Sequence, residues 1–383
     1  MKIVYIFKSF ALKAGMERIL SDKMNYLVKE YGFDVTFITY EQGNHPLAFP
    51  LDKRVKVIDL NVLYFKIFEM NNFKRFIAKY KKLSILKKKL HDTLNQINPD
   101  CVVVTTYDFD KFDIILSLPY RFIVESHICI SDIRQEIRQN NFISKYFAKK
   151  LDECHFRKLN NANCLVSLTN ADKANWVNHT KIPIVVIPNM VTKFPNTIYT
   201  YNKRPNRILC VGRLTKQKGY DLLLHAWARI SKKHPTWKID IYGHGNMETT
   251  LNQMIIDYGL SNSTKINELS DNIYDEYENS SIFVLSSRYE GFALVLLEAM
   301  SCGVPCVSFD CPHGPSDLIS HREDGLLVPL GDIKKMADAI EWMITNKEER
   351  LRMSNNAREK AKQYTAEAIM PQWVELFEKV AKQ

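Results

Sequence analysis

The chain has 383 residues, of which 46% are hydrophobic and 25% are charged. This composition is typical of a soluble globular protein, and the length predicts two domains because it exceeds what one ordinary hydrophobic core serves. No apolar run approaches the length of a bilayer-spanning helix, and the first residues lack the long apolar region and cleavage site of a signal peptide. These features argue against an integral membrane protein and favour a protein of the cytoplasm.

Positive charge is concentrated in the first half of the chain. The formal net charge is +10, and residues 1–200 contain 30 lysines and arginines against 19 acidic residues, so the second half is close to neutral. This one-sided charge predicts an anionic surface or a polyanionic partner for the first half. None of the 8 cysteines forms a C-x2-C pair and most lie in apolar stretches, which indicates buried reduced thiols and no metal site.

Short apolar segments typical of strands alternate along the chain with amphipathic segments typical of helices. This alternation predicts an α/β fold with parallel sheets covered on both faces. In chain order, strands are expected at residues 2–7, 34–39, 56–60, 101–106, 121–126, 164–169, 207–212, 237–243, 281–287, 305–309 and 325–329, and helices at residues 17–32, 221–234, 293–303, 334–346 and 371–383.

Residues 188–206 contain three prolines and several asparagines without a helical period, which is typical of a linker. We therefore expect two Rossmann-like halves, an N-terminal domain over residues 1–190 and a C-terminal domain over residues 205–367, with a cleft between their sheets. Ligands of such sheets bind beyond the carboxyl ends of the strands.

The first candidate site lies after the strand expected at residues 207–212. Gly212 permits a close backbone approach, and Arg213 and Lys218 follow it, so both cations could converge on a diphosphate. A surface loop with solvated charges is the alternative. Gly243 also follows a strand, in the sequence GHG, but an ordinary turn explains that glycine almost as well.

The strongest signal is the segment SSRYEGFALVLLEAM. Glu290 follows a strand, residues Gly291, Phe292 and Ala293 are expected to open a helix, and Glu298 lies within that helix. Free N–H groups at a helix start favour a phosphate, and the two carboxylates could bind the hydroxyl groups of a sugar and of a ribose. The alternative is an exposed acid plus a second acid paired locally. A glutamate inside so apolar a run needs a partner.

Taken together, the patterns GRL-x3-KG, EG-x6-EAM-x2-G-x-P and DGLLV-x3-D resemble those of glycosyltransferase family 4, whose members are retaining enzymes of the GT-B fold. The resemblance covers nearly the whole chain. It implies a metal-independent transfer from a nucleotide sugar, most often a UDP-sugar, with no cofactor. Arg213 and Lys218 would then bind the diphosphate, Glu290 the transferred sugar with Phe292 and Ala293 nearby, and Glu298 the ribose.

The resemblance extends to the N-terminal half. It implies that the last helix, residues 368–383, crosses back to complete the N-terminal domain. KAGMER resembles the glycine loop of the family, although Ala14 precedes Gly15 where two glycines are common. The family often has a histidine after the strand at residues 121–126, near the transferred sugar, which assigns that role to His127. Its neighbour Glu125 is expected on the other face of the strand; without the resemblance, His127 is equally well a strand-end histidine.

Residues 61–91 contain nine lysines and arginines, one glutamate and interleaved aromatic residues, and Phe73, Phe76, Ile77 and Tyr80 would share a face of a helix. This pattern suits an anionic membrane surface, and many family members act on lipid-linked saccharides. The alternative is a solvated helix packed on its own core. The segment 138–150, which contains four further basic residues, would extend the basic surface.

The expected function is therefore transfer of a hexose or N-acetylhexosamine from a UDP-sugar to a lipid-linked saccharide at the cytoplasmic membrane face, in surface polysaccharide or glycan biosynthesis. A sugar-nucleotide epimerase or a phosphorylase could share the architecture, and the basic half leaves a membrane- or nucleic-acid-binding protein as a rival. No nucleic-acid-binding motif is present, so no nucleic acid is expected. Asp108 and Asp110 form a D-x-D sequence in the wrong half for a donor metal.

Overall fold

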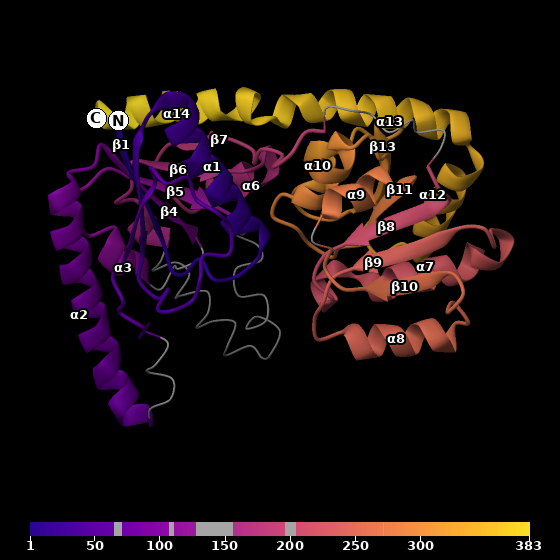
Figure 1. Cartoon of the computed structure of the whole chain (residues 1–383), viewed down its shortest axis with the longest axis horizontal. Helices are drawn as coiled ribbons and strands as arrows, with labels where there is room; N and C mark the ends of the chain where they lie inside the picture. Colours follow the sequence, from indigo (N-terminus) through magenta and orange to yellow (C-terminus); the bar gives the residue numbers. More distant parts are fainter. Residues whose placement is uncertain (65–70, 107–110, 128–155, 196–203, 271) are drawn as a thin grey trace. The chain divides into compact units, whose positions relative to one another are not determined.

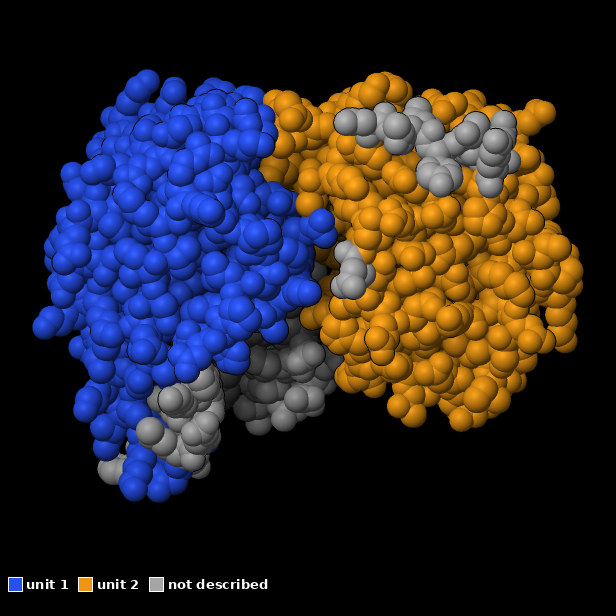
Figure 2. Space-filling model, viewed as in Figure 1, with its two compact units in different colours: residues 1–188, 369–383 blue, residues 189–368 orange. Residues whose placement is uncertain are grey.

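The protein is described by a computed structural model, in which residues 1–64, 71–106, 111–127, 156–195, 204–270 and 272–383 are described. The chain forms two compact units, coloured separately in Figure 2. Unit 1 comprises residues Met1–Pro188 together with Ile369–Gln383, and unit 2 comprises residues Asn189–Ala368. Each unit is a parallel sheet with helices on its faces (Figure 1).

The sheet of unit 1 has the strand order β3-β2-β1-β4-β5-β6-β7, and every pairing in it is parallel. The central strands are almost wholly buried, as expected for a sheet covered on both faces. The strands are β1 (Lys2–Phe7), β2 (Asp34–Thr39), β3 (Lys56–Asp59), β4 (Cys101–Thr105), β5 (Phe122–Ser126), β6 (Cys164–Ser167) and β7 (Ile184–Val186).

Helices join these strands, and the last one comes from the far end of the sequence. The helix α14 (Ala366–Ala381) begins in unit 2, and from Ile369 onward it belongs to unit 1. There the Cys101 thiol donates to the Phe377 carbonyl, and the Asn163 amide donates to Gln383. The other described helices of unit 1 are α1 (Gly15–Tyr31), α2 (Asn72–Ile97), α3 (Phe112–Ile115) and α6 (Asn170–Trp176).

The sheet of unit 2 has the strand order β10-β9-β8-β11-β12-β13, again with parallel pairings. Its strands are β8 (Arg207–Val211), β9 (Lys238–Tyr242), β10 (Thr264–Asn267), β11 (Ile282–Leu285), β12 (Cys306–Asp310) and β13 (Gly325–Pro329). The described helices include α7 (Tyr220–Ile230), α8 (Glu248–Asp257), α9 (Ile273–Glu278), α10 (Leu294–Ser301), α11 (Pro315–Leu318), α12 (Ile333–Thr345) and α13 (Lys347–Ala361).

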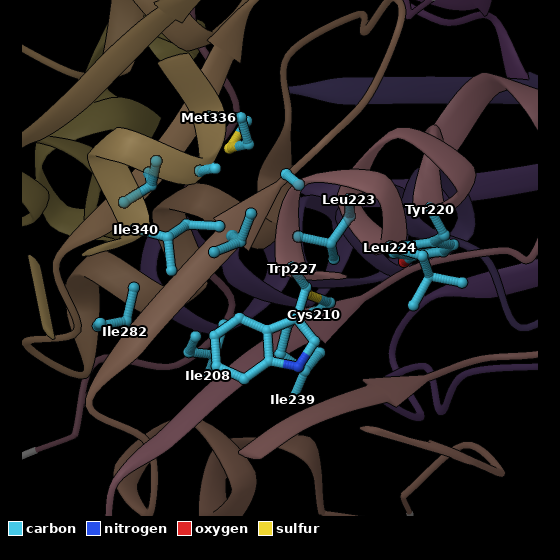
Figure 3. Close-up of a cluster of buried hydrophobic side chains, with 14 of the residues drawn as sticks. Ile208, Cys210, Tyr220, Leu223, Leu224, Trp227, Ile239, Ile282, Met336 and Ile340 are labelled. Atoms are coloured by element: carbon cyan, nitrogen blue, oxygen red, sulfur yellow. The ribbon is translucent and has the colours of Figure 1, made fainter. Parts of the chain in front are cut away.

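The core of unit 2 forms where α7 packs on β8 and β9. The wholly buried ring of Trp227 lies against Ile208, Cys210 and Ile239 of the sheet, with Leu223 and Leu224 from its own helix (Figure 3). These apolar side chains recur at helical spacing on α7 and at alternate positions on β8, so both elements bury one face against the other. This core fixes the loops that leave the carboxyl ends of β8 and β11.

The architecture confirms the predicted α/β fold of two Rossmann-like units with parallel sheets. Two short strands were absent from the prediction, namely β7 and β10. β7 has three half-buried residues, and the four residues of β10 include an exposed lysine, so neither is a long buried apolar run. In the part of the chain that the structure describes, no helix is both long and apolar enough to cross a bilayer.

In both sheets the strand order reverses direction at one place. This place lies between β1 and β4 in unit 1 and between β8 and β11 in unit 2. Loops that diverge at such a switch point leave a crevice where ligands of open α/β sheets bind. The loops after β8 and β11 contain Lys218 and Glu290, so these two residues lie at the switch point of unit 2.

Candidate functional site

The loops after β8 and β11 are joined by a dense set of hydrogen bonds. The Arg288 guanidinium contacts both carboxylate oxygens of Asp221, at 2.8 and 2.7 Å, and donates to the Lys216 carbonyl. The Ser286 hydroxyl donates to the Lys218 carbonyl at 2.9 Å. A side chain at Gly219, whose φ is 64°, would collide with the Ser286 carbonyl oxygen. The two loops therefore form one rigid support for Lys218 and Glu290.

An ion pair between Lys218 and Glu290 is the centre of the candidate site. The Lys218 Nζ lies 2.6 Å from Glu290 Oε1, and the Ser287 hydroxyl donates to the same oxygen at 2.5 Å. The side chains of Lys218 and Glu290 are 13% and 7% exposed. A cation and a carboxylate thus lie side by side at the strand ends, where one could bind an anion and the other a hydroxyl group.

Arg213 lies on the same loop but is exposed. Its guanidinium donates to the side-chain oxygen of Gln217 at 3.2 Å, and the Gln217 amide donates to the Tyr289 carbonyl at 3.1 Å. Gln217 therefore connects Arg213 with the loop that precedes Glu290. Sequence reasoning did not single out Gln217, although its position next to Lys218 in the motif was a signal.

Gly212 and Gly243 allow the loops after β8 and β9 to touch. The Gly212 N–H donates to the Tyr242 carbonyl at 3.0 Å, and a Cβ on Gly243 would collide with the Gly212 carbonyl oxygen. A Cβ on Gly212 itself would lie 3.2 Å from the Lys218 side chain. Gly212 thus leaves room for Lys218, and Gly243 has a clear packing role.

The segment after Glu290 differs from the expected helix start. Residues Gly291, Phe292 and Ala293 form a bend, and α10 begins at Leu294. Ala293 is the residue before the helix and has a left-handed conformation, with φ of 56°, which is uncommon for a residue with a Cβ. The Phe292 backbone packs against Gly314, at which a Cβ would lie 3.0 Å from the Phe292 carbonyl carbon. The helix α10 therefore begins only after this bend, at Leu294.

Glu298 on α10 has the partner that its apolar surroundings require. The Tyr277 hydroxyl on α9 donates to Glu298 Oε2 at 2.9 Å. Tyr277 is fully buried, and burial together with the nearby Glu298 charge raises the pKa of its hydroxyl well above the ordinary value. The hydroxyl therefore stays protonated and fixes the carboxylate. No sequence pattern had indicated Tyr277.

Unit 1 contains the other two predicted site residues. Gly15 is the exposed first residue of α1, directly after Ala14. His127 follows β5, and its Nε2 lies 2.7 Å from Glu125 Oε2. The expectation that Glu125 points to the other face was wrong, because residues two apart on a strand share a face. Glu125 also pairs with Lys23 of α1 at 2.9 Å.

The basic segment at residues 61–91 is only partly helical. The helix α2 begins at Asn72 and buries Leu86, Leu90 and Leu94 against the core of unit 1. Ile77 and Tyr80 are exposed, by 55% and 60%. The structure does not describe the side chains of Phe73 and Phe76, residues 65–70, or the second basic patch at residues 138–150. The packed-helix alternative therefore holds for the part of α2 that contains these leucines, and membrane binding by the segment stays a prediction.

In the described part of the chain, no group of three or more histidine, cysteine, aspartate or glutamate side chains could hold a metal ion. Asp108 and Asp110 lie outside the described residues. The six described cysteines are buried and unpaired, namely Cys101, Cys164, Cys210, Cys302, Cys306 and Cys311.

Comparison with known proteins establishes the enzyme class. Residues 196–360 match the family model for glycosyl transferases group 1. An uncharacterized glycosyltransferase of Haemophilus influenzae is 28% identical over 97% of this chain and 98% of its own length. The protein is a glycosyltransferase. A second relative of this glycosyltransferase, from Campylobacter jejuni, is 25% identical over 99% of both chains and is named GalNAc-α-(1→4)-GalNAc-α-(1→3)-diNAcBac-PP-undecaprenol α-1,4-N-acetyl-D-galactosaminyltransferase.

Solved structures show that this glycosyltransferase has the GT-B fold. Sucrose-phosphate synthase from Thermosynechococcus elongatus is similar with a TM-score of 0.81 and 18% identity, over 99% of this chain and 98% of that one. HepE from Anabaena, in complex with UDP and glucose, is similar with a TM-score of 0.75 and 16% identity over 99% of both chains. At these identities the likeness concerns the fold alone.

Proposed function

We propose that this glycosyltransferase is a retaining, metal-independent enzyme of family 4 that transfers a hexose or N-acetylhexosamine from a UDP-sugar to a lipid-linked saccharide. The ion pair between Lys218 and Glu290 carries the proposal. It lies at the switch point of unit 2, held by two interlocked loops. Relatives and neighbours that act on an undecaprenol-linked saccharide or bind UDP support the choice of acceptor and donor.

Binding of the donor would divide this ion pair between two parts of one ligand. Lys218 would turn to the diphosphate, with Arg213 beside it, while Glu290 would accept hydroxyl groups of the sugar. Ser287 already donates to Glu290 and so keeps the carboxylate oriented when Lys218 leaves. The N–H groups at the start of α10 would add a positive dipole, and Glu298, fixed by Tyr277, would accept from the ribose hydroxyls.

In the reaction, the bond between the anomeric carbon and a diphosphate oxygen breaks, and an acceptor hydroxyl oxygen bonds to that carbon from the same face. The hydroxyl proton passes to the departing phosphate oxygen. Negative charge accumulates on the diphosphate, where Lys218, Arg213 and the start of α10 would stabilise it. These fixed cations and dipoles would take the place of a metal ion.

Calorimetric titration of UDP, GDP and ADP, in buffer with a chelator, tests the donor site. We expect selective binding of UDP and its loss in Lys218→Ala, with Lys216→Ala, an exposed lysine of the same loop, as the matched control. Absence of nucleotide binding would contradict the donor assignment and would revive the non-catalytic alternatives. Turnover of the sugar nucleotide without an acceptor would instead favour an epimerase, and the anomeric configuration of the product, read by NMR, tests retention.

The helix α2 would bring the acceptor unit to an anionic membrane at the cytoplasmic face. Lys74, Ile77, Tyr80, Lys81 and Lys88 share one exposed face by helical spacing, opposite the buried leucines. Lys89 is less available because its ammonium donates to the Leu60 carbonyl at 2.7 Å. Basic and apolar side chains on one face match the interface of an anionic bilayer.

Sedimentation with vesicles tests the membrane surface. We expect binding to vesicles that contain phosphatidylglycerol but not to vesicles of phosphatidylcholine alone. The double variant Lys81→Glu with Lys88→Glu should bind more weakly, because each removed cation lowers the binding free energy by about 1 kcal/mol or more. Lys334→Glu with Lys347→Glu, at exposed positions of unit 2, is the control with the same charge change. Salt-sensitive binding to RNA with no preference for anionic vesicles would favour the nucleic-acid alternative.

A further inference from the structure

A buried cluster of charged side chains lies behind His127. Lys23 comes from the middle of α1, Glu125 from β5, and His127 directly follows that strand. A single oxygen, Glu125 Oε2, accepts from Lys23 Nζ at 2.9 Å and contacts His127 Nε2 at 2.7 Å. The side chains of Lys23 and Glu125 are 0% exposed, and that of His127 is 4% exposed.

The C-terminal helix closes this cluster from the other side. The ammonium of Lys23 lies 4.0 Å from the centroid of the Trp373 ring, a distance typical of a cation–π contact. Burial lowers the pKa of Lys23, although the nearby charge of Glu125 raises it. Burial alone would raise the pKa of Glu125, but Lys23 and the contact with His127 lower it to about 2. Glu125 is therefore a carboxylate.

The charge of Glu125 decides where the hydrogen of His127 lies. A carboxylate can only accept, so the short contact requires a hydrogen on His127 Nε2. A neutral imidazole then has its lone pair on Nδ1, which has no hydrogen-bond partner among the described residues. Desolvation of a lysine and a glutamate is costly, and a packed apolar pair would fill the same space more cheaply, which suggests a purpose beyond stability.

We propose that Lys23 and Glu125, supported by Trp373, are positioning residues that hold the hydrogen of His127 on Nε2 and so present Nδ1 to the substrate. The role of His127 at the substrate rests on the proposed function. Lys23 acts by keeping Glu125 ionised. Without this cation, the buried carboxyl group would take up a proton and could donate to Nε2, which would move the hydrogen of the imidazole to Nδ1.

Lys23→Met tests the proposal with little change in shape. The buried carboxyl group of Glu125, without its cation, would take up a proton and donate to His127 Nε2, so the hydrogen of the imidazole would move to Nδ1. In Glu125→Gln, by contrast, an amide oxygen at the position of Oε2 can accept from both Lys23 and His127, which keeps the hydrogen on Nε2. We expect ¹⁵N NMR of histidine-labelled protein at about pH 8.5 to show the exchange of tautomers in Lys23→Met and not in Glu125→Gln. The signal is assigned by its absence in His127→Gln.

Kinetics of the same variants give the second measurement. We expect kcat for sugar transfer to fall by on the order of tenfold or more in Lys23→Met, with little change in KM for the donor. Lys23→Arg, which keeps a cation beside Glu125, should restore both the tautomer and kcat. Lys29→Met, on an exposed position of α1, is the matched control.

An unchanged tautomer in Lys23→Met would overturn the proposal, and so would a changed tautomer with an unchanged kcat. The tautomer is read without any substrate. If the wild-type protein neither bound a nucleotide nor transferred a sugar, the proposed function and the substrate contact of His127 would fall together. The spectrum would still decide whether Glu125 holds the hydrogen on Nε2.

Discussion

Each unit contains a lysine–glutamate pair near the carboxyl ends of its central strands, and the two pairs have different surroundings. Lys218 and Glu290 in unit 2 are partly exposed, lie on loops and are 2.6 Å apart. Lys23 and Glu125 in unit 1 are fully buried, lie on a helix and a strand and are 2.9 Å apart. A pair that reaches solvent can exchange its partner for a ligand, whereas a pair without access to water can only orient a neighbour.

The largest effect that we expect is on the free energy of unfolding, when the lysine of each pair is replaced in turn. Lys23→Met removes the cation beside the buried Glu125, whose carboxyl group must then take up a proton at neutral pH, so we expect it to lower the free energy of unfolding by about 3–5 kcal/mol. Lys218→Met leaves Glu290 with the Ser287 hydroxyl and near solvent, so about 1–2 kcal/mol is expected. Urea denaturation of both variants measures the difference, and equal losses would contradict the contrast.

Activity should respond more strongly to changes in Lys218 and Glu290 than to changes in Lys23. Lys218→Ala and Glu290→Ala should each lower kcat by about 10²–10³-fold, because they remove charge stabilisation or sugar contacts, while the fold stays intact. Steady-state kinetics with a UDP-sugar, together with circular dichroism, measures this, and Lys216→Ala is the control. Wild-type rates in both variants would refute the site, and strong inhibition of the wild type by a chelator would refute the metal-independent mechanism.

The buried pair should also set part of the acid stability. Lys23 and His127 lower the pKa of Glu125 in the folded state to about 2, against about 4.3 for an unfolded glutamate. A lowered pKa contributes stability above the unfolded value, and this contribution is lost as the pH falls from about 5 towards 2. In Glu125→Gln, we expect the free energy of unfolding to change less with pH over this range, by on the order of 1–3 kcal/mol. A parallel pH dependence in variant and wild type would contradict the assignment.

The smallest expected effect concerns the ribose contact. Tyr277→Phe removes the hydroxyl that fixes Glu298, so we expect about tenfold weaker binding of UDP, equivalent to roughly 1.4 kcal/mol, with little change in kcat. Tyr274→Phe is the matched control, since the Tyr274 hydroxyl accepts instead from the Lys193 N–H at 3.0 Å. Calorimetry measures both affinities. Equal weakening in the two variants would mean that the loss reflects packing rather than Glu298.

The sequence predicted most of the strands because parallel strands that are buried on both faces are continuous apolar runs. It missed β7 and β10, which are short and only partly buried. It also expected Gly291, Phe292 and Ala293 to open α10, since nothing in the sequence shows that Ala293 adopts a left-handed conformation before Leu294. Such a conformation is imposed by the surrounding packing and not by the local preference of alanine.

For the candidate site too, the sequence predicted one part and only the structure showed the other. The sequence by itself determined the α/β fold and which charged residues follow its strands, because loop residues at strand ends carry both the spacing and the chemistry of a ligand site, and its resemblance to glycosyltransferase family 4 indicated the enzyme class. Only the tertiary structure decided their partners: Ser287 beside Glu290, Tyr277 beside Glu298, and Lys23 with Trp373 behind Glu125. Trp373 follows Lys23 by hundreds of residues along the chain. Contacts between such distant residues arise when folded elements pack together, and no local pattern encodes them.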